Sequence, residues 1–305
     1  MWAAALTLPW LYLSSLLLPA VPSEPNATEG GCFKLSVRRE WRGLSSKQKT
    51  AYHNAVKCIN SKANVIESGG RSKTTFDDFS YVHYELRHTA THIFKWHRWF
   101  LEMHVAELKI CGYTDAMPYW DWTRDSGTAA NFLSSEMFHP TKGFGNLAII
   151  GTCLEDGPYA GMQISVPEPH CLKRGVNPMS IDPKQWTKST ILKIMENSDF
   201  INFWNQTARI PHDKVHDAIH GDLGEHYSPN DPLFYLHHAQ VDRMWTQWQG
   251  RNKTRIQDYA GNTIQNSTAN DARLNDMMPM LGLAESRTVE SMMDTQANGL
   301  CYTVS

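Results

Sequence analysis

The stretch that decides the architecture is residues 212–238, HDKVHDAIHGDLGEHYSPNDPLFYLHH. Packing alone does not need so many histidines, which are His212, His216, His220, His226, His237 and His238. Pro211 stands where a first helical turn tolerates proline and Gly221 where a helix can stop, so we predict a helix over 211–220. Pro232 and Gly250 bound a second predicted helix over 232–249 in the same way.

Helical spacing limits which of these histidines can share a metal ion. His212 and His216 are four residues apart and so lie on one face of the predicted helix, as do His216 and His220. His212 and His220 would be roughly 12 Å apart along the axis, which is too far for one ion. Since His220 lies at the helix end, a role in satisfying the helix dipole is the simpler interpretation for it.

A third ligand for that ion is expected from the next helix. Adjacent residues point about 100° apart on a helix, so at most one of His237 and His238 faces a given ion. Asp242 follows His238 by four residues, where its carboxylate could hold the second N–H of that imidazole. This spacing favours His238 as the ligand and Asp242 as its support.

A second histidine cluster occupies HYELRHTATHIFKWH at 83–97. His97 falls on a predicted helix over 92–110, and His88 belongs to the preceding loop, because nine residues on one helix would place the two on opposite sides. His83 ends a short helix that starts at Thr75-x-x-Asp78. Neither cluster contains cysteine and few carboxylates stand at ligand spacing, so all-imidazole sites for copper or zinc are indicated.

The rest of the chain indicates the compartment and the partners. The 305 residues carry a formal charge of -2 without a basic block, which argues against nucleic acid as a partner. Residues 1–22 are uncharged and predict a secretory signal in preference to a membrane anchor, because the apolar run is short and is broken by Pro9, so no membrane association is expected after cleavage. Six cysteines without a CxxC pair favour three disulfides and an oxidising, secreted context. Four glycosylation sequons begin at Asn26, Asn205, Asn252 and Asn266.

Helical patterns dominate, beginning with a capping box at Ser45-x-x-Gln48 that opens a helix over 45–63. Residues 124–182 are rich in Gly and Pro, hold Cys153 and Cys171, and are expected to form a long loop pinned by a disulfide. The predicted fold is mainly α: an antiparallel helix bundle that holds a dinuclear site, with irregular disulfide-pinned loops and few short strands. Residues 23–44 are expected to form a leader and N-terminal segment before one catalytic domain over 45–305.

These motifs together resemble the type-3 copper proteins, which are the tyrosinases, catechol oxidases and hemocyanins. In the first cluster, the similar segments are FDDFSYVH and the spacing from His88 to Trp96-His97-Arg98. MPYWDW at 117–122 is similar as well. In the second cluster, the similar segment is His212-x3-His216 followed by SPNDPLFYLHH and Trp248-Gln249. The chain is most similar to short, fungal-type tyrosinases, with a copper A region at 76–108, a copper B region at 208–250 and no C-terminal lid domain.

The resemblance implies two copper ions, O2 and a small phenolic substrate that is oxidised to an o-quinone. One copper would take His83, His88 and His97, with His92 as the alternative to His83, and the other would take His212, His216 and His238. Asp213 stands where many tyrosinases have Asn after the first copper B histidine, and is a candidate base. Leu86 replaces the cysteine that some members link to a histidine, so no thioether is expected.

Three other interpretations fit parts of the pattern. HDKVH and HDAIH resemble the HExxH of zinc peptidases, but Asp is shorter than Glu by one methylene and the first histidine cluster would go unexplained. A hemocyanin-like oxygen carrier would use the same ligands without turnover. A structural relative without copper is disfavoured by the complete ligand set. The pattern does not distinguish monophenolase from diphenolase activity.

Overall fold

The computed structural model describes residues 32–305 except for 87–92, 149, 177–180 and 265–266. Its α-helices are α1 (Ser46–Ser61), α2 (Thr75–Leu86), α3 (Ile93–Ile110), α4 (Ala129–Leu133), α5 (Lys188–Ile194), α6 (Phe200–Thr207), α7 (Asp213–Ala218) and α8 (Leu233–Gly250). The strands are β1 (Ser36–Arg38), β2 (Gln163–Ile164), β3 (His170–Cys171), β4 (Arg174–Gly175), β5 (His220–Gly221), β6 (Met277–Met278), β7 (Arg287–Thr288) and β8 (Tyr302–Val304). The predictions for the signal segment, Asn26, His88, His92 and Asn266 lie outside the described residues.

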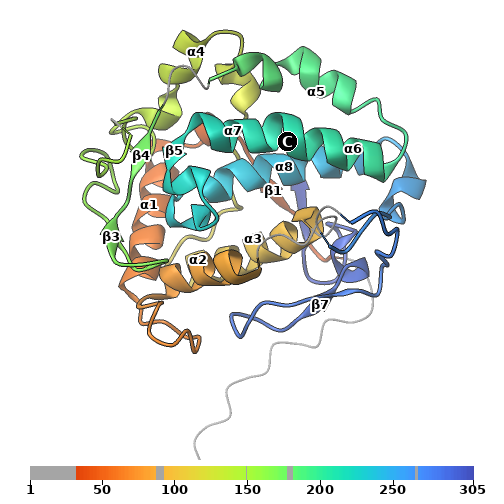
Figure 1. The fold of residues 1–305 in the computed structure, drawn as a ribbon, viewed down its shortest axis with the longest axis horizontal. Coiled ribbons are helices and arrows are strands. Elements are labelled where there is room, and N and C mark those ends of the chain that lie inside the picture. The colour runs from red at the N-terminus through yellow and green to blue at the C-terminus, as the bar shows by residue number, and fades with distance from the viewer. Residues whose placement is uncertain (1–31, 87–92, 149, 177–180, 265–266) are drawn as a thin grey trace, which may run out of the picture. The chain divides into compact units, whose positions relative to one another are not determined.

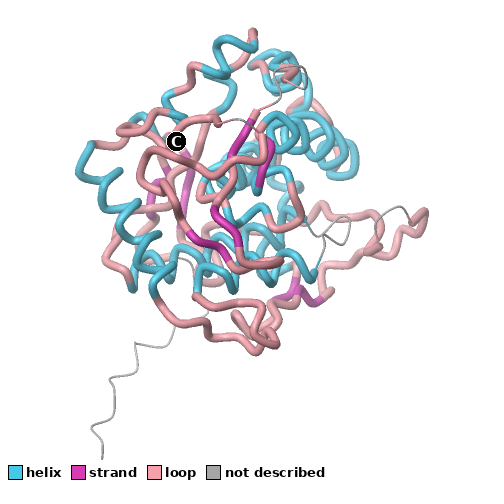
Figure 2. The backbone as a smooth tube through the Cα atoms, turned by 60° about the vertical axis from the view of Figure 1, so that its left-hand side comes forward, coloured by secondary structure: helices cyan, strands magenta, loops and turns pink. Residues whose placement is uncertain are grey.

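The core is a bundle in which α3 packs against α8, and α1 packs against α2 and α3 (Figure 1). The predicted capping box is present, since Ser45 and Gln48 each accept a hydrogen bond from the other's backbone. Most residues of α8 are buried, because this helix runs through the centre of the bundle. The mainly α prediction is confirmed, and Figure 2 shows long loops and few short strands around the helices.

The helix predicted over 211–220 is built differently. Helix α6 continues into a π-helical turn, Ala208–His212, and α7 follows directly. Pro211 therefore lies inside the wide turn and does not open a helix, so the predicted start is wrong. Proline has no N–H and crowds the carbonyl four residues before it, and a wider turn relieves that crowding. His220 falls beyond the helix, on β5.

The loop predicted over 124–182 is largely irregular, but Thr128 caps the short helix α4 within it, which corrects that prediction. Disulfides join all six cysteines as Cys32–Cys301, Cys58–Cys111 and Cys153–Cys171. Strand β4 pairs with β5, and a Cβ at Gly221 would stand 2.3 Å from the Lys173 carbonyl oxygen. Only glycine therefore allows this close approach between the loop and the second histidine cluster.

The other two-stranded pairs are β2–β3 and β6–β7, which are antiparallel, and β1–β8, which is parallel. The β1–β8 pair brings the first and last described segments together beside the Cys32–Cys301 disulfide. Among the described helices, none combines the length and apolar character that a membrane crossing requires.

Candidate metal centre

Four histidines of the second cluster converge on one point. His212 comes from the π-helical turn, His216 from α7, and His237 and His238 from α8. Each offers a nitrogen, and these nitrogens all lie within 4.8 Å of one another. The Nε2 atoms of His216 and His238 are 3.4 Å apart. Two bonds of about 2.0–2.1 Å to one ion at a near-tetrahedral angle place nitrogens at roughly this separation, so the cluster fits a metal.

The tautomers of two of these imidazoles are determined by what their Nδ1 atoms contact. His216 Nδ1 lies 2.6 Å from the Leu223 carbonyl oxygen, and His212 Nδ1 lies 2.8 Å from Oδ1 of Asp213. Because a carbonyl or carboxylate oxygen only accepts, both Nδ1 atoms carry the proton. The Nε2 lone pairs are therefore available to a metal, and that of His212 has no hydrogen-bond partner among the described residues.

His237 has the opposite arrangement. The indole Nε1–H of Trp122 donates to His237 Nδ1 at 3.2 Å, so the neutral ring carries its proton on Nε2. A protonated Nε2 has no lone pair for a metal. Geometry alone brings four imidazoles together, but this tautomer favours His238 over His237 as the ligand. The contact also gives MPYWDW a role that the sequence did not suggest, since Trp122 ends that motif.

Two histidines of the first cluster lie beside the second cluster. His83 is in the last turn of α2, as predicted, and its Nδ1 donates to the carbonyl oxygen of His226 at 2.6 Å. His97 is on α3 and donates from Nδ1 to the Ile93 carbonyl oxygen at 2.6 Å. The His83 and His97 rings are 5.5 Å apart, and His97 stacks on His238 at 3.8 Å. These two imidazoles are thus oriented by carbonyls in the same way as His216.

Burial keeps these imidazoles neutral. Loss of solvent lowers the pKa of His83 and of His216 to about 3, although the backbone carbonyl that each contacts opposes this. Burial, with the neighbouring histidines, also lowers the pKa of His97 and His238 well below the ordinary value. Neutral imidazoles are the form that binds a metal, so the site is electrostatically suited to one.

The expected support of His238 by Asp242 is not what the structure shows. Asp242 Oδ1 accepts from Arg98 Nε at 2.6 Å, and Oδ2 accepts from Arg38 Nη1 at 2.8 Å and from the Tyr302 hydroxyl at 2.5 Å. No hydrogen bond of Asp242 within the described ranges reaches His238. Two buried guanidinium groups bind a carboxylate more strongly than one neutral N–H does, which explains the difference. Among the histidines of the candidate centre, the imidazole that a carboxylate does hold is that of His212, through Asp213.

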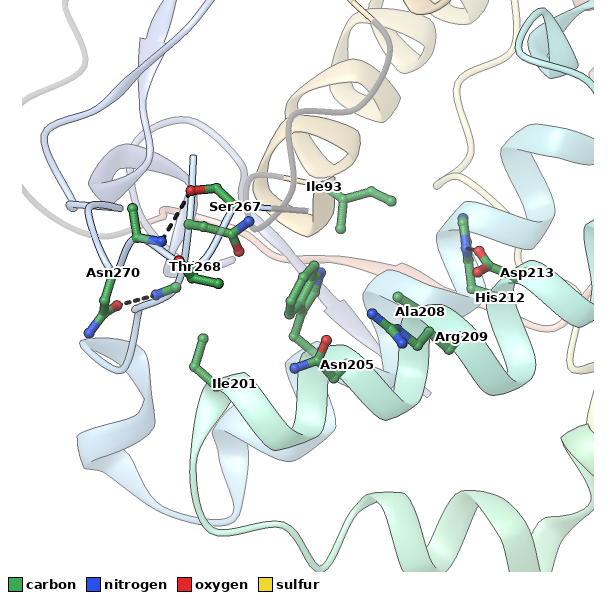
Figure 3. A pocket seen from close by; sticks show the side chains of 14 residues that line it. Ile93, Ile201, Asn205, Ala208, Arg209, His212, Asp213, Ser267, Thr268 and Asn270 are labelled. Atoms are coloured by element: carbon green, nitrogen blue, oxygen red, sulfur yellow. Dashed lines mark hydrogen bonds and ion pairs between the residues drawn. The ribbon is translucent and has the colours of Figure 1, made fainter. Parts of the chain in front are cut away.

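A pocket of about 580 Å³ opens beside His212 and Asp213. Figure 3 shows Ile201, Asn205, Ala208, Arg209 and these two residues along one wall. The facing side is lined by Ile93, Ser267, Thr268 and Asn270. A small molecule in this pocket would contact the candidate centre at His212. Pockets of this size hold small ligands.

Comparisons with known proteins identify the family of this chain. The family model described as the common central domain of tyrosinase matches residues 73–251. The tyrosinase ustQ of Aspergillus flavus is 33% identical over 293 residues, which cover 89% of this chain and 80% of that protein. A polyphenol oxidase variant from Thermothelomyces thermophila superposes with a TM-score of 0.78 at 28% identity, covering 89% of both chains. A functional unit of Octopus hemocyanin shares the fold, with a TM-score of 0.56, 22% identity and coverage of 88% of this chain and 68% of that one.

The helical core and the histidine cluster define a type-3 copper protein. The chain belongs to the tyrosinase family, whose members bind two copper ions, and it is a copper-dependent oxidase. The predicted family, the copper cofactor and the disulfides are thereby confirmed.

Proposed function

We propose that this protein oxidises phenols and o-diphenols to o-quinones with O2 at a dinuclear copper centre. The observation that supports this best is that His83, His97, His212 and His216 each have an Nδ1–H bonded to an oxygen, and that His212 borders an open pocket. The proposed ligands are His83, His88 and His97 for one ion and His212, His216 and His238 for the other. When bound, the copper pair supplies the transfer of electrons from the phenol to O2.

The choice of His238 over its neighbour can be tested by copper content. We expect His238→Phe to bind about one copper less per chain than the wild type, because it removes a ligand. His237→Phe removes an imidazole of the same size whose Nε2 is protonated, and should keep both ions. Metal analysis after reconstitution and dialysis measures this. Loss of copper from His237→Phe alone would reverse the assignment.

We propose that Asp213 holds the Nδ1–H of His212 with one oxygen and accepts the substrate proton with the other. The side chain is 52% exposed and lines the pocket, so its second oxygen can reach a bound phenol. Burial raises its pKa, but the hydrogen bond that it accepts from His212 and the charge on Lys214 outweigh this, and the pKa of Asp213 is lowered. The carboxylate is therefore ionised near neutral pH.

The test is oxygen uptake by the copper-reconstituted protein with tyrosol and with 4-methylcatechol. Asp213→Asn keeps an oxygen for His212 but removes the charge that accepts the substrate proton. We therefore expect the turnover of tyrosol to fall by about tenfold or more, and that of 4-methylcatechol to fall less. Asp213→Ala removes both functions and should slow both substrates. If Asp213→Ala turned over both at wild-type rates, neither proposed role would stand.

Oxygen binding without turnover is the competing proposal, since the hemocyanin unit shares the fold. The pocket beside His212 favours the oxidase, because a carrier has no need to admit a ring to its metal centre. Oxygen uptake with any simple catechol distinguishes the two. A protein that binds O2 reversibly but oxidises none of the phenols would be a carrier.

We also propose secretion, cleavage of a signal near residue 22 and a single catalytic domain over 45–305. The pairing of all six cysteines supports an oxidising compartment. The core that α1, α2, α3 and α8 share supports one domain. N-terminal sequencing of protein from culture medium tests the cleavage, and an uncleaved start would contradict it.

A further inference from the structure

The pocket beside His212 is lined by a cationic side chain, that of Arg209, which the proposed chemistry does not use. We propose that Arg209 and Asn205 recognise a carboxylate, so that the pocket takes phenols whose side chain ends in a carboxylic acid. This proposal rests on the proposed function, because it names the substrate class for the same site.

Arg209 is exposed and stands three residues before His212 on the π-helical turn. It lines the pocket but makes no hydrogen bond or ion pair with any described residue, not even with Asp213 four residues further on. One oxygen of Asp213 is already bonded to His212. The guanidinium is therefore a charge that faces the pocket without a counter-ion from the described chain.

Asn205 precedes Arg209 by four residues and lines the same wall (Figure 3). Its amide likewise makes no hydrogen bond to a described residue, and so offers an N–H. A guanidinium binds a carboxylate through two parallel N–H groups, and an amide beside it adds a third donor. A neutral phenol would leave all of these donors to water.

The apolar part of the pocket suits an aromatic ring on a short linker. Ile93, Ile201, Trp204 and Ala208 supply apolar surface, and His212 marks the end at which the hydroxyl would be oxidised. The same wall thus contacts both ends of the substrate, with Arg209 one helical turn from the candidate metal ligand. A bound ion at His212 adds positive charge and further favours an anionic phenol.

The experiment compares Arg209→Gln with the wild type on two catechols, 3-(3,4-dihydroxyphenyl)propionate and 4-methylcatechol. The measured quantity is the ratio of kcat/KM for the acid to that for the neutral catechol. We expect Arg209→Gln to lower this ratio about tenfold, mainly through KM for the acid, and Arg209→Lys to restore part of it. Salt should weaken the preference in the wild type more than in Arg209→Gln.

Arg39→Gln is the matched control, since Arg39 is exposed, makes no side-chain bond to a described residue and does not line the pocket. It should keep the wild-type ratio. A ratio that Arg209→Gln leaves unchanged, or that Arg39→Gln lowers equally, overturns the proposal.

A binding measurement separates this proposal from the proposed function. Calorimetry on the metal-free protein compares 3-(4-hydroxyphenyl)propionate with 4-ethylphenol, and needs no turnover. We expect tighter binding of the acid by the wild type and loss of that preference in Arg209→Gln. If no phenol is oxidised but this preference is present, the proposed function fails and carboxylate recognition stands. If phenols are oxidised and the acid binds no better than 4-ethylphenol, carboxylate recognition fails alone.

Discussion

Replacing Tyr302 with Phe should destabilise the protein through one identifiable hydrogen bond. The Tyr302 hydroxyl is buried and donates to Asp242 at 2.5 Å, while Arg98 and Arg38 occupy the rest of that carboxylate. A hydrogen bond to a charged group contributes about 1.5–3 kcal/mol to stability. The Arg38 guanidinium lies 3.5 Å from the centre of the Tyr302 ring, and this contact survives in Phe. We therefore expect a loss of about 2 kcal/mol in the free energy of unfolding.

Tyr235→Phe provides a matched control in the same core. Tyr235 is fully buried and stacks on His104 at 3.6 Å, but its hydroxyl has no hydrogen-bond partner among the described residues. Removing that oxygen leaves no described group unpaired and eliminates a buried polar atom that has no hydrogen-bond partner among the described residues. We expect Tyr235→Phe to be neutral or stabilising by about 1 kcal/mol. Both changes delete one oxygen from a buried tyrosine, so the difference between them isolates the bond to Asp242.

The assay is guanidinium unfolding of the metal-free protein with its disulfides intact, followed by tryptophan fluorescence and circular dichroism. Removing copper prevents metal binding from contributing to the measured stability. The midpoint should fall for Tyr302→Phe without a change in the denaturant slope. Equal losses in both variants, or a loss below about 0.5 kcal/mol for Tyr302→Phe, would show that the bond to Asp242 does not stabilise the fold as argued.

Two further predictions concern pH and glycosylation. The pKa of His170 is raised, mainly by its hydrogen bond to Asp222, so its contribution to stability is present below about pH 6.5 and is lost as pH rises through the folded value. His170→Gln should therefore cost more stability near pH 5.5 than near pH 8.5 in denaturant titrations, by up to about 1 kcal/mol, and an equal cost at both would refute this. In peptide mass spectrometry of secreted protein, exposed Asn252 should carry a glycan, whereas Asn205, another of the four predicted glycosylation sites, should not because it lines the pocket. A glycan on Asn205 of active protein would contradict the pocket assignment.

Much of the bundle follows from local signals in the sequence. The capping box at Ser45, the helical pattern over 92–110 and the Pro232–Gly250 bounds of α8 are all short-range patterns, and each helix formed near its predicted limits. The π-helical turn at Ala208–His212 could not be predicted in this way. Pro211 alone fits either the start of a helix or a widened turn between α6 and α7, so the local sequence does not decide between them.

The pattern of histidines pointed to the site, but not to the groups that orient them. Spacing and family resemblance selected His83 and His97, which the structure brings beside the second cluster. The carbonyl that holds His83 belongs to His226, 143 residues further along the chain, and a backbone oxygen leaves no trace in a sequence. Helical spacing predicted that the Asp242 carboxylate would hold the imidazole of His238. Instead, Arg38 and Arg98 from other elements bind that carboxylate.

The adjacent histidines His237 and His238 show that residue type and proximity are not enough to identify a metal ligand. Both are buried, and both place a nitrogen within 4.8 Å of the other members of the cluster. They differ because the indole N–H of Trp122 donates a hydrogen bond to Nδ1 of His237, so the proton of the His237 ring is on Nε2. A fourth imidazole with a free lone pair would complete a closed tetrahedral site, the geometry of structural zinc centres. By withholding that lone pair, Trp122 would leave the imidazoles of His212, His216 and His238 to hold the ion.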